Sequence, residues 1–331
     1  MDNSLRIGLN ATDWRRRALI AGLAAAPFVS RAQPVSRRSI RVIALEAGSQ
    51  SDTVARIFLP AIEAHLGRDL FVENHGGAGG RIAARMVAHA SDGHTVGVGG
   101  ANNLVMATLL GQDTGYDTAR DFTYIAALAR VPFAIAVRSD LPVRTIADAV
   151  ALAKRSEREL TYGSAGVGGS SHLAMAAIAH LQSISLLHVP FRGSNLATND
   201  VVAGRIDFVA TDLARLLPFA SAGKVRIIAV TGRARDPRVA DIATLSEQGL
   251  AGLYLDPWYG LYGPRTIGEA LRGELTRAVT RASSDGGVRQ RASSAGMILL
   301  PPTSELFESL ISSDMRRFAP LIGAIRANQR D

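Results

Sequence analysis

Short apolar runs alternate with helical patterns along most of the chain. The run at 40–44 predicts a strand, the pattern at 51–65 a helix, and the runs at 70–73 and 95–99 further strands. A helical pattern at 81–89 lies between the last two strands. This order of strands and helices predicts a mostly parallel sheet with helices on both faces.

A second alternation begins at the apolar run 133–137, which Pro142 follows closely. Its predicted elements are helices at 145–154, 170–181, 195–203 and 214–222, and strands at 160–162, 187–189, 206–210 and 225–230. Another extended run at 258–262 ends at Gly263 and Pro264. Helical patterns at 267–284 and 303–325 then close the chain.

Two extended runs, each followed by proline, thus bracket a self-contained α/β unit. We expect a first lobe formed by 33–132 together with 257–331, and a second lobe, 133–256, inserted into it. Two crossing strands between such lobes form a hinge, which suits a clamshell that closes over a ligand. Two sequential, independent domains remain the alternative.

The first 32 residues have the pattern of a secretory signal peptide. Three consecutive arginines, Arg15 to Arg17, precede an apolar stretch at 18–29 that is too short to span a bilayer comfortably. Ser30 and Ala32 supply small residues at the −3 and −1 positions of a cleavage site. We therefore expect cleavage near Ala32, export by the Sec or twin-arginine route, and a mature protein in the periplasm.

Composition and charge narrow the class of protein. The 331 residues are 47% hydrophobic and 20% charged, as in an ordinary globular protein with room for two domains. The formal charge is +8, but the arginines are scattered, whereas nucleic-acid binding usually needs a clustered basic stripe. We expect no nucleic-acid partner, and a positive surface instead attracts small anions. The absence of cysteine excludes disulfides, thiol catalysis and cysteine-ligated zinc.

The most informative motif is the glycine-rich loop at 163–169, which follows one predicted strand and opens the helix at 170–181. A helix N-terminus presents unpaired N–H groups and the positive end of the helix dipole, so this arrangement binds anions. For this segment alone, a tight turn that holds no ligand remains the alternative. The candidate ligand-binding residues here are Ser164, Ala165, Gly166, Gly168, Ser170 and Ser171.

The segment 48–52 repeats this arrangement after the first predicted strand. Its candidates are Gly48, Ser49, Ser51 and Asp52, although Ser51 or Asp52 could cap the helix without any ligand. Two helix N-termini from different lobes could face each other across a cleft and donate to one ligand. That conjunction is more specific than either loop.

Residues at two other predicted strand ends add candidates. Asn102 follows the strand at 95–99, at the end where open α/β sheets bind ligands. Arg192 could pair with a carboxylate and Phe191 could form an apolar wall, but solvent exposure explains a loop arginine equally well. The glycine run at 76–80 lacks the Lys-Ser/Thr ending of a phosphate-binding loop, so we interpret it as structural.

Motifs for catalysis are missing. The chain has no G-x-S-x-G elbow, no H-E-x-x-H and no convincing carboxylate pair. His172 and His188 lack the spacing of a metal site, and the glycines after the strand at 95–99 lack the remainder of a dinucleotide fingerprint. We expect no catalytic residue, no metal and no cofactor, and interpret the protein as one that binds without turnover.

Several short motifs occur together in a characteristic order. They lie at 72–74 with 76–80, 92–95, 162–166 with 171–173, 188–193, 222–226 and 258–261. In this order they resemble the substrate-binding proteins of tripartite tricarboxylate transporters, also called the Bug family. The resemblance covers about 39–325.

This resemblance implies a two-lobed α/β fold similar to type II periplasmic binding proteins, with mostly parallel sheets flanked by helices and a cleft between the lobes. It implies a monomer that closes over a small organic acid or amino acid and delivers it to membrane transporter subunits. A ligand sensor that presents its bound state to a membrane receptor kinase would have the same fold and site. It remains the main alternative, and a secreted enzyme is a third.

Two segments depart from the family pattern. Glu46 lies where the family usually has an aromatic residue and prolines, and could bring negative charge near the cleft unless it pairs or points away. Thr211 and Asp212 stand where the family often has aspartate followed by asparagine. Asp212 completes the candidate set, and both departures leave room for a ligand with an amino group or a neutral ring.

Overall fold

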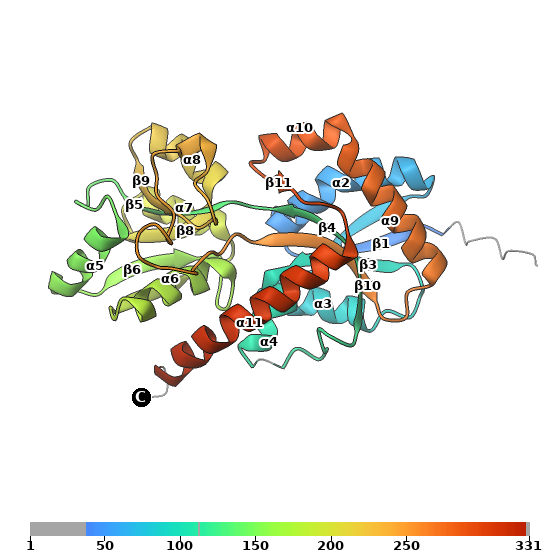
Figure 1. The fold of residues 1–331 in the computed structure, drawn as a ribbon, viewed down its shortest axis with the longest axis horizontal. Helices are drawn as coiled ribbons and strands as arrows, with labels where there is room; N and C mark the ends of the chain where they lie inside the picture. The colour runs from blue at the N-terminus through green and yellow to red at the C-terminus, as the bar shows by residue number, and fades with distance from the viewer. Residues whose placement is uncertain (1–37, 112, 329–331) are drawn as a thin grey trace, which may run out of the picture. The chain divides into compact units, whose positions relative to one another are not determined.

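The computed structural model describes residues 38–111 and 113–328, which form two β-sheets with helices packed on their faces (Figure 1). The predicted signal peptide at 1–32 lies outside these described residues. Within them, no helix has the length and apolar character needed to cross a membrane.

The first sheet has the strand order β11-β4-β10-β3-β1-β2. Its strands are β1 (Ile40–Ala44), β2 (Leu70–Asn74), β3 (Thr95–Gly100), β4 (Phe122–Arg130), β10 (Trp258–Pro264) and β11 (Ile298–Leu299). β1 pairs in parallel with β2 and β3, whereas β10 is antiparallel to β3 and β4. The helices α2 (Gln50–Leu66), α9 (Glu269–Ser284) and α10 (Gly286–Ser294) cover one face, and α3 (Arg81–Ala88) and α11 (Ser304–Asn328) the other.

The second sheet has the strand order β7-β6-β8-β5-β9. Its strands are β5 (Phe133–Arg138), β6 (Leu160–Ser164), β7 (Leu186–Pro190), β8 (Phe208–Asp212) and β9 (Val225–Val230). β6 pairs in parallel with β7 and β8, whereas β5 is antiparallel to β8 and β9. The helices α5 (Ile146–Arg155) and α6 (Ser170–Leu181) cover one face, and α7 (Ser194–Val202) and α8 (Leu213–Ser221) the other.

In the described part of the chain, four short helical elements connect these layers. They are η2 (Ala78–Gly80), the π-helical turn η3 (Asn102–Met106), α4 (Ala107–Leu109) and η4 (Pro237–Val239). Local chemistry fixes several helix ends: Thr145 and Asp148 form a capping box at the start of α5, and Gly67 ends α2 with a φ of +63°.

The predicted α/β class is confirmed, but each sheet is mixed rather than mostly parallel. β10 and β5 run antiparallel to their neighbours in the two sheets. The sequence pattern also misses β4, because most of its residues are buried and it lacks the polar–apolar alternation of a half-exposed strand.

The chain crosses between the sheets twice, from β4 to β5 and again before β10. The first sheet takes its strands from 40–130 and 258–299, and the second from 133–230. At the crossings, the N–H of Val131 donates to the carbonyl oxygen of Pro257 at 2.7 Å. The lobe boundaries at 132/133 and 256/257 stay a prediction.

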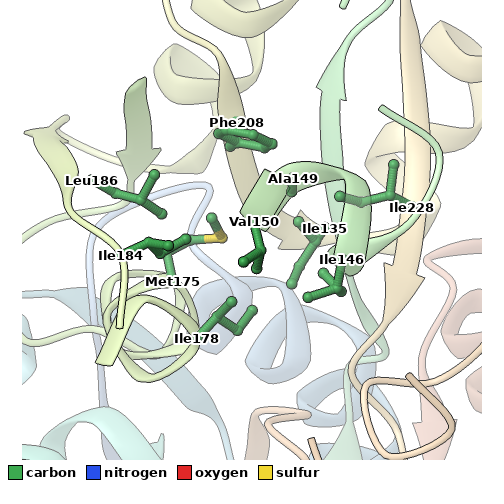
Figure 2. A pocket seen from close by; sticks show the side chains of 10 residues that line it. All are labelled: Ile135, Ile146, Ala149, Val150, Met175, Ile178, Ile184, Leu186, Phe208 and Ile228. Carbon is green, nitrogen blue, oxygen red and sulfur yellow. The ribbon is translucent and has the colours of Figure 1, made fainter. Parts of the chain in front are cut away.

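A small gap lies inside the second sheet's core. Figure 2 shows ten apolar side chains around it, among them Ile135, Met175 and Phe208. Its volume of about 10 Å³ is close to the minimum that one water needs, and its lining offers no polar group. It is therefore an imperfection in core packing and not a ligand site.

Candidate functional site

The candidate residues gather at the carboxyl ends of parallel strands. Ser49 and Asn102 follow β1 and β3 in the first sheet, while Ser164 and Asp212 end β6 and β8 in the second. Since β6 and β8 are neighbouring parallel strands, Ser164 and Asp212 lie at the same edge of their sheet. Open α/β sheets bind their ligands at such edges.

Two sets of hydrogen bonds join the loops of one sheet to those of the other. Gln50 Nε2 donates to Asp212 Oδ2 at 2.5 Å. The backbone N–H and the hydroxyl of Ser170 donate to Asn102 Oδ1 at 2.9 and 2.6 Å. The helix N-termini of α2 and α6 are therefore linked to the facing sheet, the first through Asp212 and the second through Asn102.

Internal hydrogen bonds shape the loop between β6 and α6. The N–H of Ala165 donates to Ser171 Oγ at 3.0 Å, and the N–H of Gly166 donates to Ser164 Oγ at 3.1 Å. Gly166 and Gly168 have φ values of +134° and +80°, which residues with a Cβ rarely adopt. Several donors expected to hold a ligand are thus occupied within the loop, and those that reach across belong to Ser170.

Two histidines contact this loop through hydrogen bonds to Ser164 and Gly168. The His172 and His188 rings stack with centroids 4.1 Å apart, and His188 Nε2 lies 2.6 Å from Ser164 Oγ. Gly168 N–H donates to His172 Nδ1 at 3.1 Å, which requires an unprotonated Nδ1. Burial, and secondarily the nearby His188, lowers the pKa of His172 to about 4, so the ring is neutral at pH 7. Among the described residues, no cluster of three or more His, Asp or Glu could hold a metal.

The loop between β1 and α2 is braced by Ser51 and Asp52. Ser51 Oγ donates to the Val98 carbonyl oxygen at 2.6 Å, and Asp52 Oδ2 accepts from the N–H of Gly48 at 2.9 Å. Burial works to raise the pKa of Asp52, but hydrogen bonds, chiefly from Arg56, outweigh it and the pKa is lowered. Ser49 Oγ caps α2 by accepting from the N–H of Asp52. Capping and bracing therefore account for these side chains without a ligand.

Glu46 binds the neighbouring glycine loop. Its Oε1 accepts from the N–H of Gly77 at 2.8 Å, and a Cβ at Gly76 would come within 2.3 Å of the Glu46 side chain. The same loop approaches the second sheet's loop, where a Cβ on Gly79 would lie 3.9 Å from the Val167 carbonyl oxygen. The carboxylate of Glu46 is thus held by a backbone donor in the 76–80 loop.

Asp212 is a buried carboxylate that lacks a donor for one of its oxygens. Burial raises its pKa, although Arg215 and Gln50 act in the opposite direction. Arg215 Nε lies 3.4 Å from Oδ2, while Oδ1 has no hydrogen-bond partner in the described part of the chain. Gln50 Oε1 is likewise buried without a partner there. The bonded pair therefore keeps two acceptors that lack donors, one on each side chain.

Gln50 is the functional candidate that sequence reasoning missed. It lies inside the 48–52 motif, at the first position of α2, between the candidate residues Ser49 and Ser51. That position is the signal in the sequence that points to it. A side chain at the first turn of a helix points toward whatever faces the helix N-terminus, and here that is Asp212.

Phe191 and Arg192 occupy different environments. The Phe191 N–H donates to the Ser164 carbonyl oxygen at 3.0 Å, and its ring packs over Gly163. Arg192 is exposed, and no hydrogen bond or ion pair ties it to the rest of the described chain. Phe191 thus helps to position the loop, while the Arg192 guanidinium is free to pair with an anion.

Sequence comparison decides the family. The model of the family described as "Tripartite tricarboxylate transporter family receptor" matches residues 54–326. The chain belongs to this family. One relative is the UPF0065 protein in the tcbD-tcbE intergenic region of Pseudomonas sp. strain P51. It is 32% identical to this chain over 325 residues, which cover 95% of each protein.

Solved structures share the receptor's fold. MatC from Rhodopseudomonas palustris, solved with bound malate, has a TM-score of 0.79 and 30% identity, covering 88% of this chain and all of MatC. The periplasmic binding protein BugD has a TM-score of 0.78 and 26% identity, covering 87% of this chain and 97% of BugD. These relatives confirm the two-lobed α/β fold and the resemblance to the Bug family. Family members are periplasmic solute-binding proteins.

Proposed function

We propose that this receptor is a periplasmic solute-binding protein that captures a small carboxylate, either an organic acid or an amino acid, and delivers it to a membrane transporter. The ligand would lie between lobes formed by 33–132 with 257–331 and by 133–256. Malate in MatC supports the carboxylate, and the family's name supports the transporter.

The contact between Ser170 and Asn102 carries this proposal. Two donors at the N-terminus of α6 already hold an oxygen acceptor from the facing loop. A ligand carboxylate offers the same acceptor chemistry with a full negative charge, which the helix dipole favours further. Asn102 begins the π-helical turn η3, a kind of turn that often occurs at functional sites.

The remaining candidates divide by their contacts. Ser170, Asn102, Arg192 and Asp212 would touch the ligand, together with Gln50. The residues that would shape the loops around it are Gly48, Ser49, Ser51, Asp52, Ser164, Ala165, Gly166, Gly168, Ser171 and Phe191.

Closure of the two lobes would follow from contacts that the ligand makes with both lobes only in the closed state. Micromolar affinity corresponds to about −8 kcal/mol.

A thermal-shift screen of carboxylates and amino acids, followed by calorimetry, tests the binding function. We expect one ligand to stabilise the protein with micromolar affinity. Arg192→Ala should weaken it by about 1.5–3 kcal/mol, the contribution of a charge-assisted hydrogen bond. Arg281→Ala removes an exposed arginine from α9 and should leave the affinity unchanged. If no anionic compound stabilises the protein, the carboxylate proposal is wrong.

Delivery and location need separate measurements. Deleting the gene should abolish uptake of the radiolabelled ligand by the producing cells, and restoring it should return uptake. Unchanged uptake together with a lost transcriptional response to the ligand would instead favour the sensor. The periplasmic fraction should contain a protein whose N-terminus begins near Gln33, as the predicted cleavage requires.

A further inference from the structure

The start of α2 and the end of β8 meet through two side chains that each leave one oxygen unpaired. Gln50 Nε2 donates to Asp212 Oδ2 at 2.5 Å, and Arg215 Nε lies 3.4 Å from the same oxygen. Asp212 Oδ1 and Gln50 Oε1 are both buried and have no hydrogen-bond partner among the described residues. The two unpaired oxygens therefore belong to two groups that one hydrogen bond already joins.

The surroundings supply no other donor to these oxygens. The hydroxyl of Thr211, the neighbour of Asp212 in sequence, is itself buried without a partner in the described chain, so it does not donate to Asp212. Both oxygens are shielded from solvent, so water does not reach them. Two buried acceptors without a donor destabilise the contact between α2 and β8 as long as Asp212 is ionised.

A single proton satisfies both oxygens. A protonated carboxyl group has one O–H donor and one carbonyl acceptor, and a primary amide likewise has N–H donors and a carbonyl acceptor. The two groups can therefore form a cyclic pair, with Gln50 Nε2 donating to Asp212 Oδ2 and Asp212 Oδ1 donating to Gln50 Oε1. The first of these hydrogen bonds is present in the structure. An ionised Asp212 only accepts, so it cannot make the second.

The groups around Asp212 favour its neutral form. Burial raises the pKa of Asp212, while the charge of Arg215 and the hydrogen bond from Gln50 act against burial without outweighing it. The Arg215 side chain is 28% exposed, so solvent screens part of its charge. Tyr259 on β10 is the other titratable group that interacts with Asp212. Its own pKa is raised by burial and then by Asp212, so it stays a neutral hydroxyl.

We propose that Asp212 carries a proton on Oδ1 in the ligand-free protein at pH 6, and that this O–H donates to Gln50 Oε1 to complete a cyclic acid–amide pair. The proton comes from solvent and returns to solvent when Asp212 ionises. The contact between α2 and β8 is therefore pH-sensitive, because it loses one of its two hydrogen bonds as the pH rises and the proton leaves. The proposal concerns the protein without ligand, so it does not depend on the carboxylate function proposed above.

Infrared spectroscopy detects this proton, because the carbonyl stretch of a carboxylic acid absorbs apart from the carboxylate and amide bands. An ordinary aspartate, with a pKa of about 3.9, is ionised at pH 6. The difference spectrum between the natural protein and Asp212→Asn at pH 6 should show the loss of one carboxylic-acid band. Asp241→Asn, at an exposed position, should remove none. If Asp212→Asn also removes none, Asp212 is ionised and the proposal is wrong.

Gln50→Leu tests the partner of the proton. Because this variant removes both hydrogen bonds of the pair, the acid band should move to higher frequency in the difference spectrum against the natural protein. The measurement does not need Asp212→Asn, so it remains available if that variant fails to fold. An acid band at the same frequency in Gln50→Leu and the natural protein would mean that Gln50 does not share the proton, which would overturn the pair.

Thermal unfolding at pH 6 gives a second, independent test. An asparagine amide mimics the protonated acid, since Oδ1 accepts from Gln50 and Nδ2 donates to it. We therefore expect Asp212→Asn to keep or raise the melting temperature. Asp256→Asn is the matched control, because Asp256 is largely buried and its two oxygens accept from Arg130 and from the N–H of Phe133.

An amide at position 256 places N–H groups against existing donors. The melting temperature of Asp256→Asn should therefore fall by about 5 °C or more. A fall of the same size in Asp212→Asn would mean that Asp212 accepts hydrogen bonds as a carboxylate, and the proposed protonation would be refuted.

Discussion

Gln50 Nε2 lies 2.5 Å from Oδ2 of Asp212, so a fully buried carboxylate joins the start of α2 to the end of β8. The bond connects two elements that pack in different sheets and are 162 residues apart in sequence. Each partner also keeps one buried oxygen without a donor among the described residues. Buried polar groups of this kind are normally satisfied, and a ligand that carries a donor would satisfy them.

Asp212→Asn should shift ligand preference away from compounds with an amino group. The buried carboxylate attracts an ammonium and repels a second carboxylate, and the neutral amide does neither. We expect the ratio of aspartate to succinate affinity, measured by calorimetry, to fall at least tenfold in the variant. Asp241→Asn, at an exposed position, is the control and should keep the original ratio. An unchanged ratio for Asp212→Asn would remove Asp212 from the ligand contacts.

Asn102→Asp should strengthen the contact between η3 and the N-terminus of α6 in the absence of ligand. A carboxylate at this position would accept the same two hydrogen bonds from Ser170 and add a favourable charge at the α6 N-terminus. The melting temperature of the ligand-free protein should therefore rise, while the affinity for a carboxylate ligand should fall tenfold or more. Asn199→Asp on the exposed face of α7 should do neither. A variant that binds carboxylates as tightly as the natural protein would contradict the proposed anion position.

His172 should make folding stability depend on acidity. The unfolded chain takes up a proton near pH 6.5, whereas burial keeps the folded ring neutral until about pH 4. The unfolded state thus binds more protons in this window, so stability present above pH 6.5 is lost as the pH falls to 4. The difference of about 2.5 pKa units corresponds to roughly 3 kcal/mol.

Comparison with His172→Asn isolates this contribution. Asp212, Asp256 and Asp314 have pKa values raised by burial and act in the opposite sense, because the folded state takes up their protons first. Denaturant unfolding at pH 7 and pH 4 should show the natural protein losing roughly 3 kcal/mol more than His172→Asn. Equal losses in the two proteins would mean that the ring is protonated in the folded state near pH 6.5.

Gly100→Ala should destabilise the first sheet. A Cβ at Gly100 would lie 1.8 Å from the Trp258 carbonyl oxygen, a backbone atom of the neighbouring strand β10 that cannot rotate away. We expect a loss of about 3 kcal/mol or more in the free energy of unfolding, at the upper end of the usual cost of overpacking. Gly268→Ala is the matched control, since nothing lies within 4 Å of its Cβ. Comparable stability of the two variants would refute the predicted clash.

The sequence predicted most of the order of strands and helices along the chain. The segment 160–181 gives a strand, a glycine-rich loop and a helix in both the prediction and the structure, because local periodicity and glycine placement decide such units. β4 escaped prediction because burial on both faces erases its alternation. The antiparallel direction of β5 and β10 also escaped, since strand direction depends on long-range pairing and not on local pattern.

The sequence alone determined where the glycine-rich loops and the family motifs lie. It also located the strand ends that carry the candidate residues. The hydrogen-bond partner of each polar side chain was decided only by the tertiary structure. Ser51 and Asp52 brace their own loop, Glu46 binds the glycine loop, and Gln50, which the sequence had not singled out, reaches Asp212. A helix N-terminus can be recognised from local residues, but the atom that satisfies it comes from a segment distant in sequence.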